Sequence, residues 1–381
     1  MMISTLLQMA CDGVGPSHTC LSLSEGMRRA GAQTTVFANR LRTQAGALDI
    51  RTALPGPLAK LPYRYVSKFA SARTERAYLN ALRPDDIAYL WPSASLELSR
   101  IVRDRGNFTV LEGINTRMSH ARDVLDEAYR AESIVPAHTI TDARIAEEEE
   151  KLRLADAIFA PSPAVEEALN DLAHNGLHVL SSSYGTSFPA PDHSRASTDR
   201  TEADPVFLFV GSISIRKGAH HLLRAWVKAA PKARLRLAGH VEPAVRSLCA
   251  DELSRTDVEL TGFVRDTASL YAGADVFVLP SLEEGDPLVT YEAASFGLPI
   301  IATPAGAGRF GPASGCVETV EAGDIDQLCD AISGLAESVD RRREQGAAAL
   351  RSMPAFDWNK VGEQRIEILS RLNTGNRGAN G

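Results

Sequence analysis

Cysteines are scarce in this sequence, and their spacing argues against two classes of protein. The five are Cys11, Cys20, Cys249, Cys316 and Cys329, an odd number with no CxxC pair. Disulfide frameworks need even sets of cysteines, and structural zinc sites need closely spaced ones, so neither is supported. Reduced thiols fit a cytoplasmic protein better.

Long apolar runs are absent as well. No uncharged stretch approaches the roughly 20 residues that span a bilayer. Residues 1–7 lack the basic region and the long apolar core of a signal peptide. We therefore expect a cytoplasmic protein, either soluble or peripheral on the inner face of the membrane.

Positive charge is not in excess either. The 381 residues include 41 Lys and Arg against 48 Asp and Glu, a formal net charge of −7. General nucleic-acid binders carry the opposite balance, so we expect no nucleic-acid partner. The phosphate-binding pattern GxGxxG does not follow the first expected strand, which disfavours a dinucleotide-dependent dehydrogenase.

Short β-rich runs that alternate with helical stretches dominate what remains. This rhythm is typical of parallel α/β architecture, and the length fits two domains. We expect one doubly wound domain over 1–190, a linker within 181–200 rich in Ser, Pro, Asp and Thr, and a second domain over 200–357. The expected strands are 3–9, 34–38, 87–90, 109–111, 158–160, 206–210, 235–238, 258–260, 276–279 and 300–302. Ligands of such sheets bind beyond the carboxyl ends of the strands, here in a cleft between the domains.

The segment 280–294, PSLEEGDPLVTYEAA, carries the most informative pattern. It joins an expected strand to a helix that starts near Pro287, where a proline is well tolerated. The free amides of the first helical turn favour an anion such as phosphate. Glu292 lies one turn into this helix and Glu284 on the loop, so both carboxylates can face one ligand; alternatively, both are solvated acids near a helix N-terminus.

A second pattern lies about seventy residues upstream. The run FVGSISIRKG over 209–218 leads from a buried strand through a glycine turn to Arg216 and Lys217, before a helix over 220–229. Two cations beside helix amides suit a pyrophosphate group. The simpler alternative is that they are exposed loop charges.

The order of these motifs resembles glycosyltransferase family 4, whose members are retaining, nucleotide-sugar-dependent enzymes of the GT-B fold. The resemblance rests on GSISIRKG (211–218), LTGFV (260–264), ADVFVLPS (274–281), Glu284 followed by Glu292, and GLP (297–299). In the first half it is looser, resting on 13–16, 23–31 and 155–162. The segment 356–358 before a last helix resembles the part of the family that crosses back, so helix 358–381 is expected on the first domain.

The resemblance implies a role for each matching residue. Lys217 and Arg216 would bind the donor diphosphate, Glu292 the nucleotide ribose, and Glu284 the transferred sugar near its anomeric carbon. The remaining donor contacts would come from glycines, turn residues and the first helical turn: Gly13, Gly15, Gly211, Ser212, Phe263, Val264, Gly285, Asp286, Pro287, Leu288 and Val289. The family chemistry needs no metal and no cofactor beyond the donor, and we find no DxD pair placed like a metal-binding loop.

Two positions depart from the family. Ser212 stands where many members have an arginine, and Asp286-Pro287 stands where an aromatic residue and a glycine often follow. The first departure puts part of the diphosphate site in doubt. The second places an acid beside the expected sugar, where it would affect which sugar is accepted.

The residues that would bind the acceptor, in the first domain, are harder to identify from the sequence. Glu112, Asn115 and Arg117 follow an expected strand and are candidates for the cleft, and His120 is a candidate for contact with donor or acceptor. A lone histidine is more often a structural or surface residue than a catalytic one, and this is the alternative for His120. The four acids at 147–150 fit a solvated helix face, with one of them reaching the cleft as the alternative.

A basic segment interrupts this acidic first half. Over 51–83, seven Lys and Arg residues alternate with Leu, Tyr, Val and Phe. The part of this segment from 58 to 83 fits contact with an anionic membrane surface as well as it fits an exposed helix pair. Taken together, the sequence predicts a retaining hexosyltransferase that uses a UDP- or GDP-sugar and a glycan or lipid-linked acceptor in cell-surface polysaccharide synthesis. A nucleotide-sugar-binding protein without turnover, or an epimerase on the same fold, is the alternative.

Overall fold

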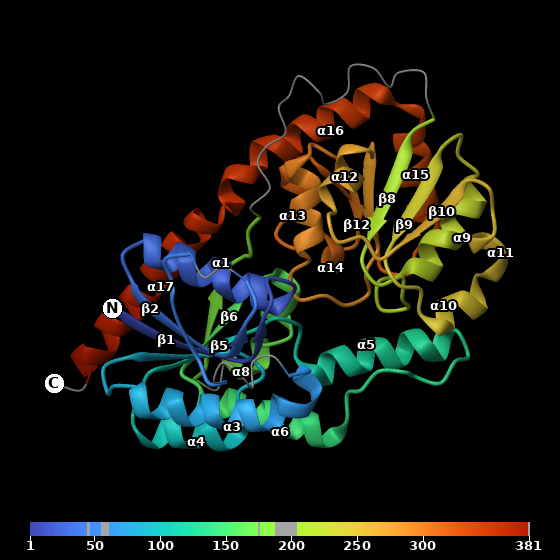
Figure 1. Cartoon of the computed structure of the whole chain (residues 1–381). Helices are drawn as coiled ribbons and strands as arrows, with labels where there is room; N and C mark the ends of the chain where they lie inside the picture. Colours follow the sequence, from blue (N-terminus) through green and yellow to red (C-terminus); the bar gives the residue numbers. More distant parts are fainter. Residues whose placement is uncertain (44–45, 55–60, 174–175, 187–203, 380–381) are drawn as a thin grey trace.

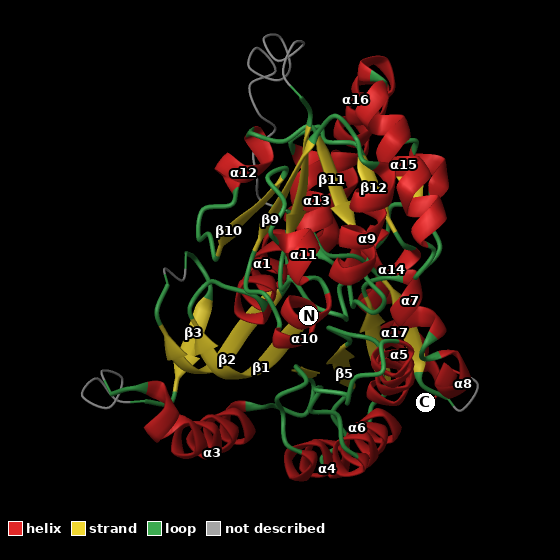
Figure 2. Cartoon of the chain, turned by 90° about the vertical axis from the view of Figure 1, so that its right-hand side faces the viewer, coloured by secondary structure: helices red, strands yellow, loops and turns green. Residues whose placement is uncertain are grey.

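The computed structural model describes residues 1–43, 46–54, 61–173, 176–186 and 204–379, which form two parallel sheets. The first sheet has the order β3-β2-β1-β4-β5-β6-β7 and the second the order β10-β9-β8-β11-β12-β13. Figure 2 shows the two sheets one above the other. The α/β, doubly wound fold expected from the sequence is confirmed.

The strands of the first sheet are β1 Met2–Cys11, β2 Gln33–Leu41, β3 Asp49–Thr52, β4 Ile87–Leu90, β5 Thr109–Glu112, β6 Ala157–Ala160 and β7 His178–Ser181. Its helices are α1 Pro16–Arg29, α3 Tyr63–Ala81, α4 Leu96–Asp104, α5 Met118–Ala131, α6 Asp142–Leu154, α7 Pro163–Glu167 and α8 Asn170–Ala173. Helices α3, α4 and α6 lie on one face of this sheet, and α1 lies on the other (Figure 1).

The strands of the second sheet are β8 Val206–Val210, β9 Arg234–Ala238, β10 Val258–Gly262, β11 Val276–Leu279, β12 Ile300–Ala302 and β13 Val317–Thr319. Its helices are α9 Ala219–Ala229, α10 Pro243–Leu248, α11 Ala250–Leu253, α12 Ala268–Ala272, α13 Leu288–Ser295, α14 Pro304–Ala307, α15 Ile325–Glu337 and α16 Val339–Ser352. Two 3₁₀ turns, η1 Pro312–Ser314 and η2 Met353–Phe356, and the long α17 Trp358–Ala379 complete the chain.

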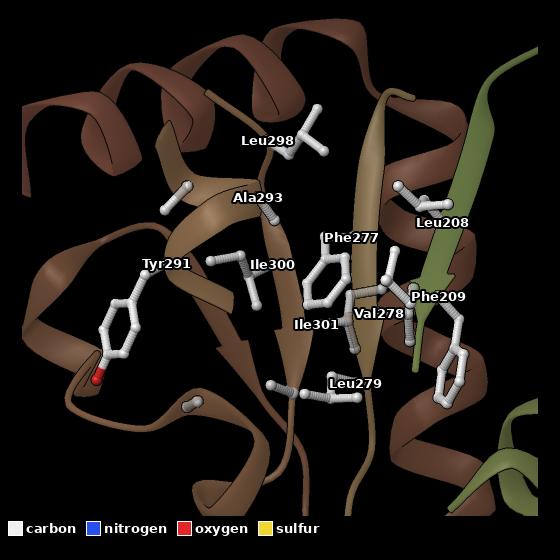
Figure 3. Packing of buried hydrophobic residues seen from close by; sticks show 14 of the residues in the cluster. Leu208, Phe209, Phe277, Val278, Leu279, Tyr291, Ala293, Leu298, Ile300 and Ile301 are labelled. Carbon is white, nitrogen blue, oxygen red and sulfur yellow. The ribbon is translucent and has the colours of Figure 1, made fainter. Parts of the chain in front are cut away.

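The central strands are buried on both faces, which is why they appear in the sequence as continuous apolar runs. Every residue of β8, β11 and β12 is buried. Figure 3 shows Phe277, Val278 and Leu279 of β11 between the labelled side chains of β8 on one side and of β12 and α13 on the other. This packing fixes the strand ends, and therefore the loops that follow them.

Helix α17 returns from the second domain to the first and packs against α1 (Figure 1). The two helices meet at glycines, since a Cβ atom on Gly26 would lie 2.2 Å from the carbonyl oxygen of Trp358. Deeper in the domain, Arg365 of α17 forms an ion pair of 2.7 Å with Glu112 of β5, and both side chains are fully buried. A segment from the end of the sequence thus completes the first domain.

Two sequence predictions differ from the structure in this half. Helix α1 begins at Pro16, five residues before the expected start, because Gly15 adopts φ 54° and Pro16 takes the first helical position. Within 51–83, the described residues hold the end of β3 and one helix, α3, instead of a helix pair. The boundary predicted between 190 and 200 lies outside the described residues, as do residues 58–60 of the basic segment and 380–381 of the last helix.

Candidate active site

The loops after β8 and β11 meet at the point where the order of the second sheet reverses. At such a point neighbouring loops diverge to opposite faces and leave a crevice for a ligand. Gly218 lets the loops approach, since a Cβ atom there would lie 1.9 Å from the carbonyl oxygen of Pro280. The amide of Leu282 also donates to the carbonyl of Arg216 at 2.8 Å.

Glu284 is the centre of a buried charged cluster at this crevice. Lys217 Nζ lies 2.5 Å from Glu284 Oε1, Arg216 Nη2 lies 2.9 Å from Oε2, and Ser281 Oγ donates to Oε1 at 3.1 Å. Burial alone would raise the pKa of Glu284, but the charges of Lys217 and Arg216 outweigh it and hold the pKa below its ordinary value. Glu284 is therefore an ionised carboxylate that forms ion pairs with both Lys217 and Arg216.

Glu283 is a member of this cluster that the motif analysis did not assign. Its Oε2 accepts from Arg216 Nε at 2.7 Å, and its Oε1 accepts from the hydroxyl of Thr116 in the first domain at 2.6 Å. The side chain is buried. The sequence did contain an indication of this role, because Glu283 and Glu284 are adjacent acids in the loop after a buried strand. Neighbouring side chains point in different directions, so the two acids can contact different partners.

Glu292 lies on α13 and keeps one oxygen free of protein partners among the described residues. Its Oε2 accepts from the hydroxyl of Tyr271 at 2.7 Å, and burial raises its pKa. The N-cap of α13 is Pro287, which provides no side-chain cap for the first turn that holds Leu288 and Val289. Amides at such a turn are available to an anion.

Asp286 has a different environment from the one expected beside a sugar. Both of its oxygens are used inside the protein: Oδ2 accepts from the amide of Tyr184 at 2.8 Å, and Oδ1 accepts from the hydroxyl of Tyr291 at 2.5 Å. Burial raises the pKa of Asp286 to about 7. Its carboxylate links the second domain to the segment that follows β7.

Gly285 lies at a close approach between the domains. A Cβ atom on it would lie 1.9 Å from the carbonyl oxygen of Ile114. Its own carbonyl accepts from the hydroxyl of Ser162. The loop after β11 therefore faces the loop after β5 at backbone contact.

The other candidate residues lie around this cluster. Gly211, at φ 136°, is in contact with Lys217, because a Cβ atom there would lie 3.1 Å from Lys217 Cε. Phe263 is 65% exposed and stacks on His240, and Val264 beside it is partly buried. Ser212 is exposed, and its carbonyl accepts from the hydroxyl of Ser214.

The loop at Gly13 and Gly15 is shaped by Ser17. The amides of Asp12, Gly13 and Val14 all donate to Ser17 Oγ, at 3.2–3.3 Å. These amides already have a protein partner, so the role predicted for this loop in facing phosphate depends on Gly15 and the start of α1.

Two acceptor-side candidates are used structurally. Glu112 is paired with Arg365 as described, which removes its carboxylate from the set available to a ligand, and Arg117 pairs with Glu149 and Asp171. Glu112 does line the concave surface on this side, but its carboxylate is paired with Arg365, which arrives from α17. His120 is exposed on the first turn of α5.

A pocket of about 380 Å³ lies beside these residues, between the loops after β4 and β5 and helix α6. Asn115, Glu147 and Glu148 line it, so the acidic run does reach a concave surface. Glu148 also accepts from the amide of Met118 at 2.6 Å.

The second domain matches a known family. Residues 204–338 match the family described as glycosyl transferases group 1. Among curated relatives, α-maltose-1-phosphate synthase of Mycolicibacterium smegmatis is 27% identical over 57% of this chain and 64% of its own length. The chain spans 40% to 64% of the length of the first three curated relatives it matches.

Solved structures agree over nearly the whole chain. Sucrose-phosphate synthase from Thermosynechococcus elongatus superposes with a TM-score of 0.75 at 19% identity, covering 98% of this chain and 99% of that one. HepE from Anabaena, solved in complex with UDP, gives a TM-score of 0.66 at 17% identity, covering 97% and 100%. The GT-B arrangement expected from the sequence is confirmed, and residues 204–338 of the second domain match the glycosyl transferases group 1.

Proposed function

We propose that the protein is a retaining glycosyltransferase that moves a hexose from a nucleotide diphosphate sugar to a glycan or lipid-linked saccharide, in the synthesis of a cell-surface polysaccharide. The observation that carries this proposal is the pairing of buried Glu284 with the partly buried Lys217 and Arg216, at the crevice of a domain that matches the glycosyl transferases group 1. The cluster faces the backbone of the first domain at Ile114.

Lys217 and Arg216 are suited to the donor diphosphate. In the transfer, the bond between the anomeric carbon and the diphosphate oxygen breaks, and an acceptor hydroxyl forms the new bond on the same face of the sugar. The acceptor proton passes to the departing diphosphate. Negative charge develops on that leaving group, and two cations already oriented by Glu284 and Glu283 stabilise it without reorganisation.

The nucleoside half of the donor fits the neighbouring elements. The free oxygen of Glu292 can accept from a ribose hydroxyl, and the exposed ring of Phe263 offers a stacking surface for the base. We propose further that transfer needs no divalent metal, because fixed cations take the part that a metal ion would have. Activity that persists in EDTA supports this, and activity that returns only with added Mg²⁺ or Mn²⁺ contradicts it.

A calorimetric panel of UDP, GDP, ADP and their common sugars tests the proposal. Saturable binding of one nucleotide series, followed by transfer to a saccharide acceptor with retained anomeric configuration, supports it. Binding without transfer or hydrolysis would instead support a nucleotide-sugar-binding protein, and conversion of the sugar without an acceptor would support an epimerase. Absence of binding across the panel contradicts the donor site.

We also propose that α3 contacts an anionic membrane that holds the acceptor. Val66, Ala70, Thr74 and Tyr78 of this helix are buried against the sheet, whereas Tyr65 and Phe69 are 71% and 51% exposed. The exposed basic residues of the same helix are Arg64, Lys68, Arg73 and Arg76. Exposed aromatics beside cations are the combination that binds anionic bilayers. Within the described residues, no helix has the length and apolar character of a membrane span.

Cosedimentation with vesicles of phosphatidylglycerol and phosphatidylcholine tests this contact. We expect Lys68→Glu with Arg76→Glu to abolish binding, while Lys228→Glu, on the second domain, leaves it unchanged. Equal binding of the double variant and the wild type would contradict the assignment to α3.

A further inference from the structure

We propose that Glu132, His220 and His221 form a binding site for one divalent transition-metal ion, with zinc favoured by the donor set, at the contact between the two domains. Glu132 directly follows α5, which extends from the first domain beneath the second, towards α10 (Figure 1). His220 and His221 lie in the first turn of α9. This inference does not depend on the proposed transfer reaction.

The geometry of the cluster is close to that of a metal site. Each residue offers one ligand atom, and these atoms lie within 4.8 Å of one another. His220 Nε2 lies 3.7 Å from Glu132 Oε1, too far for a hydrogen bond. Two tetrahedral ligands of zinc lie about 3.4 Å apart, given metal–ligand bonds of about 2.0–2.1 Å. A small inward movement would therefore seat an ion.

The two imidazoles carry polar atoms without a partner. The Nδ1 atoms of His220 and His221 are both buried, and neither has a hydrogen-bond partner among the described residues. The His220 side chain is only 1% exposed, and the two ring centroids are 3.8 Å apart. Buried polar atoms nearly always have a partner, so two adjacent exceptions are unusual, and each imidazole still has a nitrogen to offer an ion; for His220 the nitrogen near Glu132 is Nε2. Two histidines and a carboxylate, with a fourth position open, are a zinc donor set.

Arg224 determines how strongly such an ion is held. Its Nη1 and Nη2 each lie 2.6 Å from one oxygen of Glu132. Each carboxylate oxygen has two lone pairs, so Glu132 can accept from Arg224 and still bind a cation. The guanidinium charge repels the ion, however, and lowers the affinity of the site.

A metal here would hold the domains in the arrangement described. Glu132 belongs to the first domain and both histidines to the second, so the complete donor set exists only while the domains are in contact. An ion that binds this arrangement stabilises it by mass action. Thermal stability should therefore rise with zinc concentration.

Titration of the chelator-treated full chain with ZnCl₂, by calorimetry and equilibrium dialysis, tests the site. We expect saturable binding of one zinc ion per chain and a higher Tm on binding. Glu132→Gln and His221→Gln should each weaken binding at least tenfold. His178→Gln, an exposed histidine on β7, should leave the affinity unchanged. Arg224→Gln should tighten binding, because it removes the competing charge.

Cobalt(II) gives a second readout that does not depend on affinity. Its visible absorption should show four-coordinate nitrogen and oxygen ligation in the wild type, and this spectrum should be lost in His221→Gln. The circular dichroism of each metal-free variant serves as the control for folding. Absence of zinc binding, or equal binding by folded Glu132→Gln and His221→Gln variants, would overturn the proposal.

Discussion

At the scale of the residue, removal of Lys217 should reduce transfer activity much more than it reduces stability. In Lys217→Ala, Glu284 keeps Arg216 and Ser281 as partners, so the loss of stability should stay near 1–3 kcal/mol. Transfer should fall by about 10²–10³-fold, because a preorganised charge on the leaving group is lost. Steady-state kinetics beside urea unfolding check this. Lys228→Ala, which removes an exposed pair with Asp326, should change neither turnover nor stability. Unchanged turnover in folded Lys217→Ala would contradict the role of Lys217 at the donor diphosphate.

Glu292 tests the nucleoside half of the site separately. Glu292→Gln keeps the size of the side chain and an acceptor for Tyr271 but removes the charge. Affinity for the nucleoside diphosphate alone should fall about 10–100-fold, the usual worth of a hydrogen bond to a charged group. Calorimetry measures this. Glu318→Gln, at another partly buried acid of the second domain, is the matched control; equal losses in the two variants would contradict a ribose contact.

Asp286 should impose a pH dependence on stability. Burial raises its pKa to about 7 in the folded protein, against 3.8 as the ordinary value. Between about pH 4 and 7 the folded protein therefore binds a proton that the unfolded chain has lost, so this group makes stability fall as the pH rises, by at most about 1.4 kcal/mol per pH unit. Urea unfolding across this range should show a shallower fall for Asp286→Asn. A slope equal to that of the wild type would rule out Asp286 as its source.

At the scale of the element, α17 is held on the first domain by one fully buried ion pair. Arg365→Met would leave Glu112 charged and buried without its partner, which should cost about 3–5 kcal/mol. Lys360→Met breaks an exposed pair with Glu363 on the same helix and should leave stability nearly unchanged, because solvent screens such pairs. Denaturant titration of both variants makes the comparison. Similar small losses would mean that α17 is held by apolar packing instead.

Strands were predictable from the sequence where their burial requires a run of apolar residues. Strands β4, β8, β11 and β12 were expected at their observed bounds, because burial on both faces requires unbroken apolar runs. Strand β3 was missed, since its four residues Asp49–Thr52 at the sheet edge are mostly exposed and polar.

Contacts between distant parts of the sequence produce no local residue pattern from which they could be predicted. The two loops of the candidate site carry recognisable residue patterns, but the bond between Glu283 and Thr116 joins residues 167 positions apart. The pairing of Glu112 was not predictable for the same reason, because its partner Arg365 lies 253 positions downstream. Local spacing cannot encode pairs of this kind, which only the folded arrangement of both domains creates.

At the scale of the whole molecule, Gly285 fixes how closely the two domains approach. The added methyl group in Gly285→Ala would overlap the carbonyl oxygen of Ile114, so the domains must separate. We expect a larger radius of gyration by small-angle scattering and a loss of transfer of about 10²-fold, as for a misplacement of about 1 Å in an active site. Gly311→Ala, where an added Cβ meets nothing within 4 Å, should behave as the wild type. Unchanged scattering and turnover in Gly285→Ala would show that the contact yields locally.

The buried pair of Glu112 and Arg365 also bears on how the protein is made. The ribosome synthesises from the N-terminus, so every strand of the first sheet is complete long before Arg365 is added. Until then, a native-like first domain would enclose an uncompensated carboxylate, a state with a large energetic cost. The nascent first domain should therefore stay loosely packed, and open to proteases, while the second domain is being synthesised. The order in which the two halves reach their final state is then the reverse of their order in the sequence.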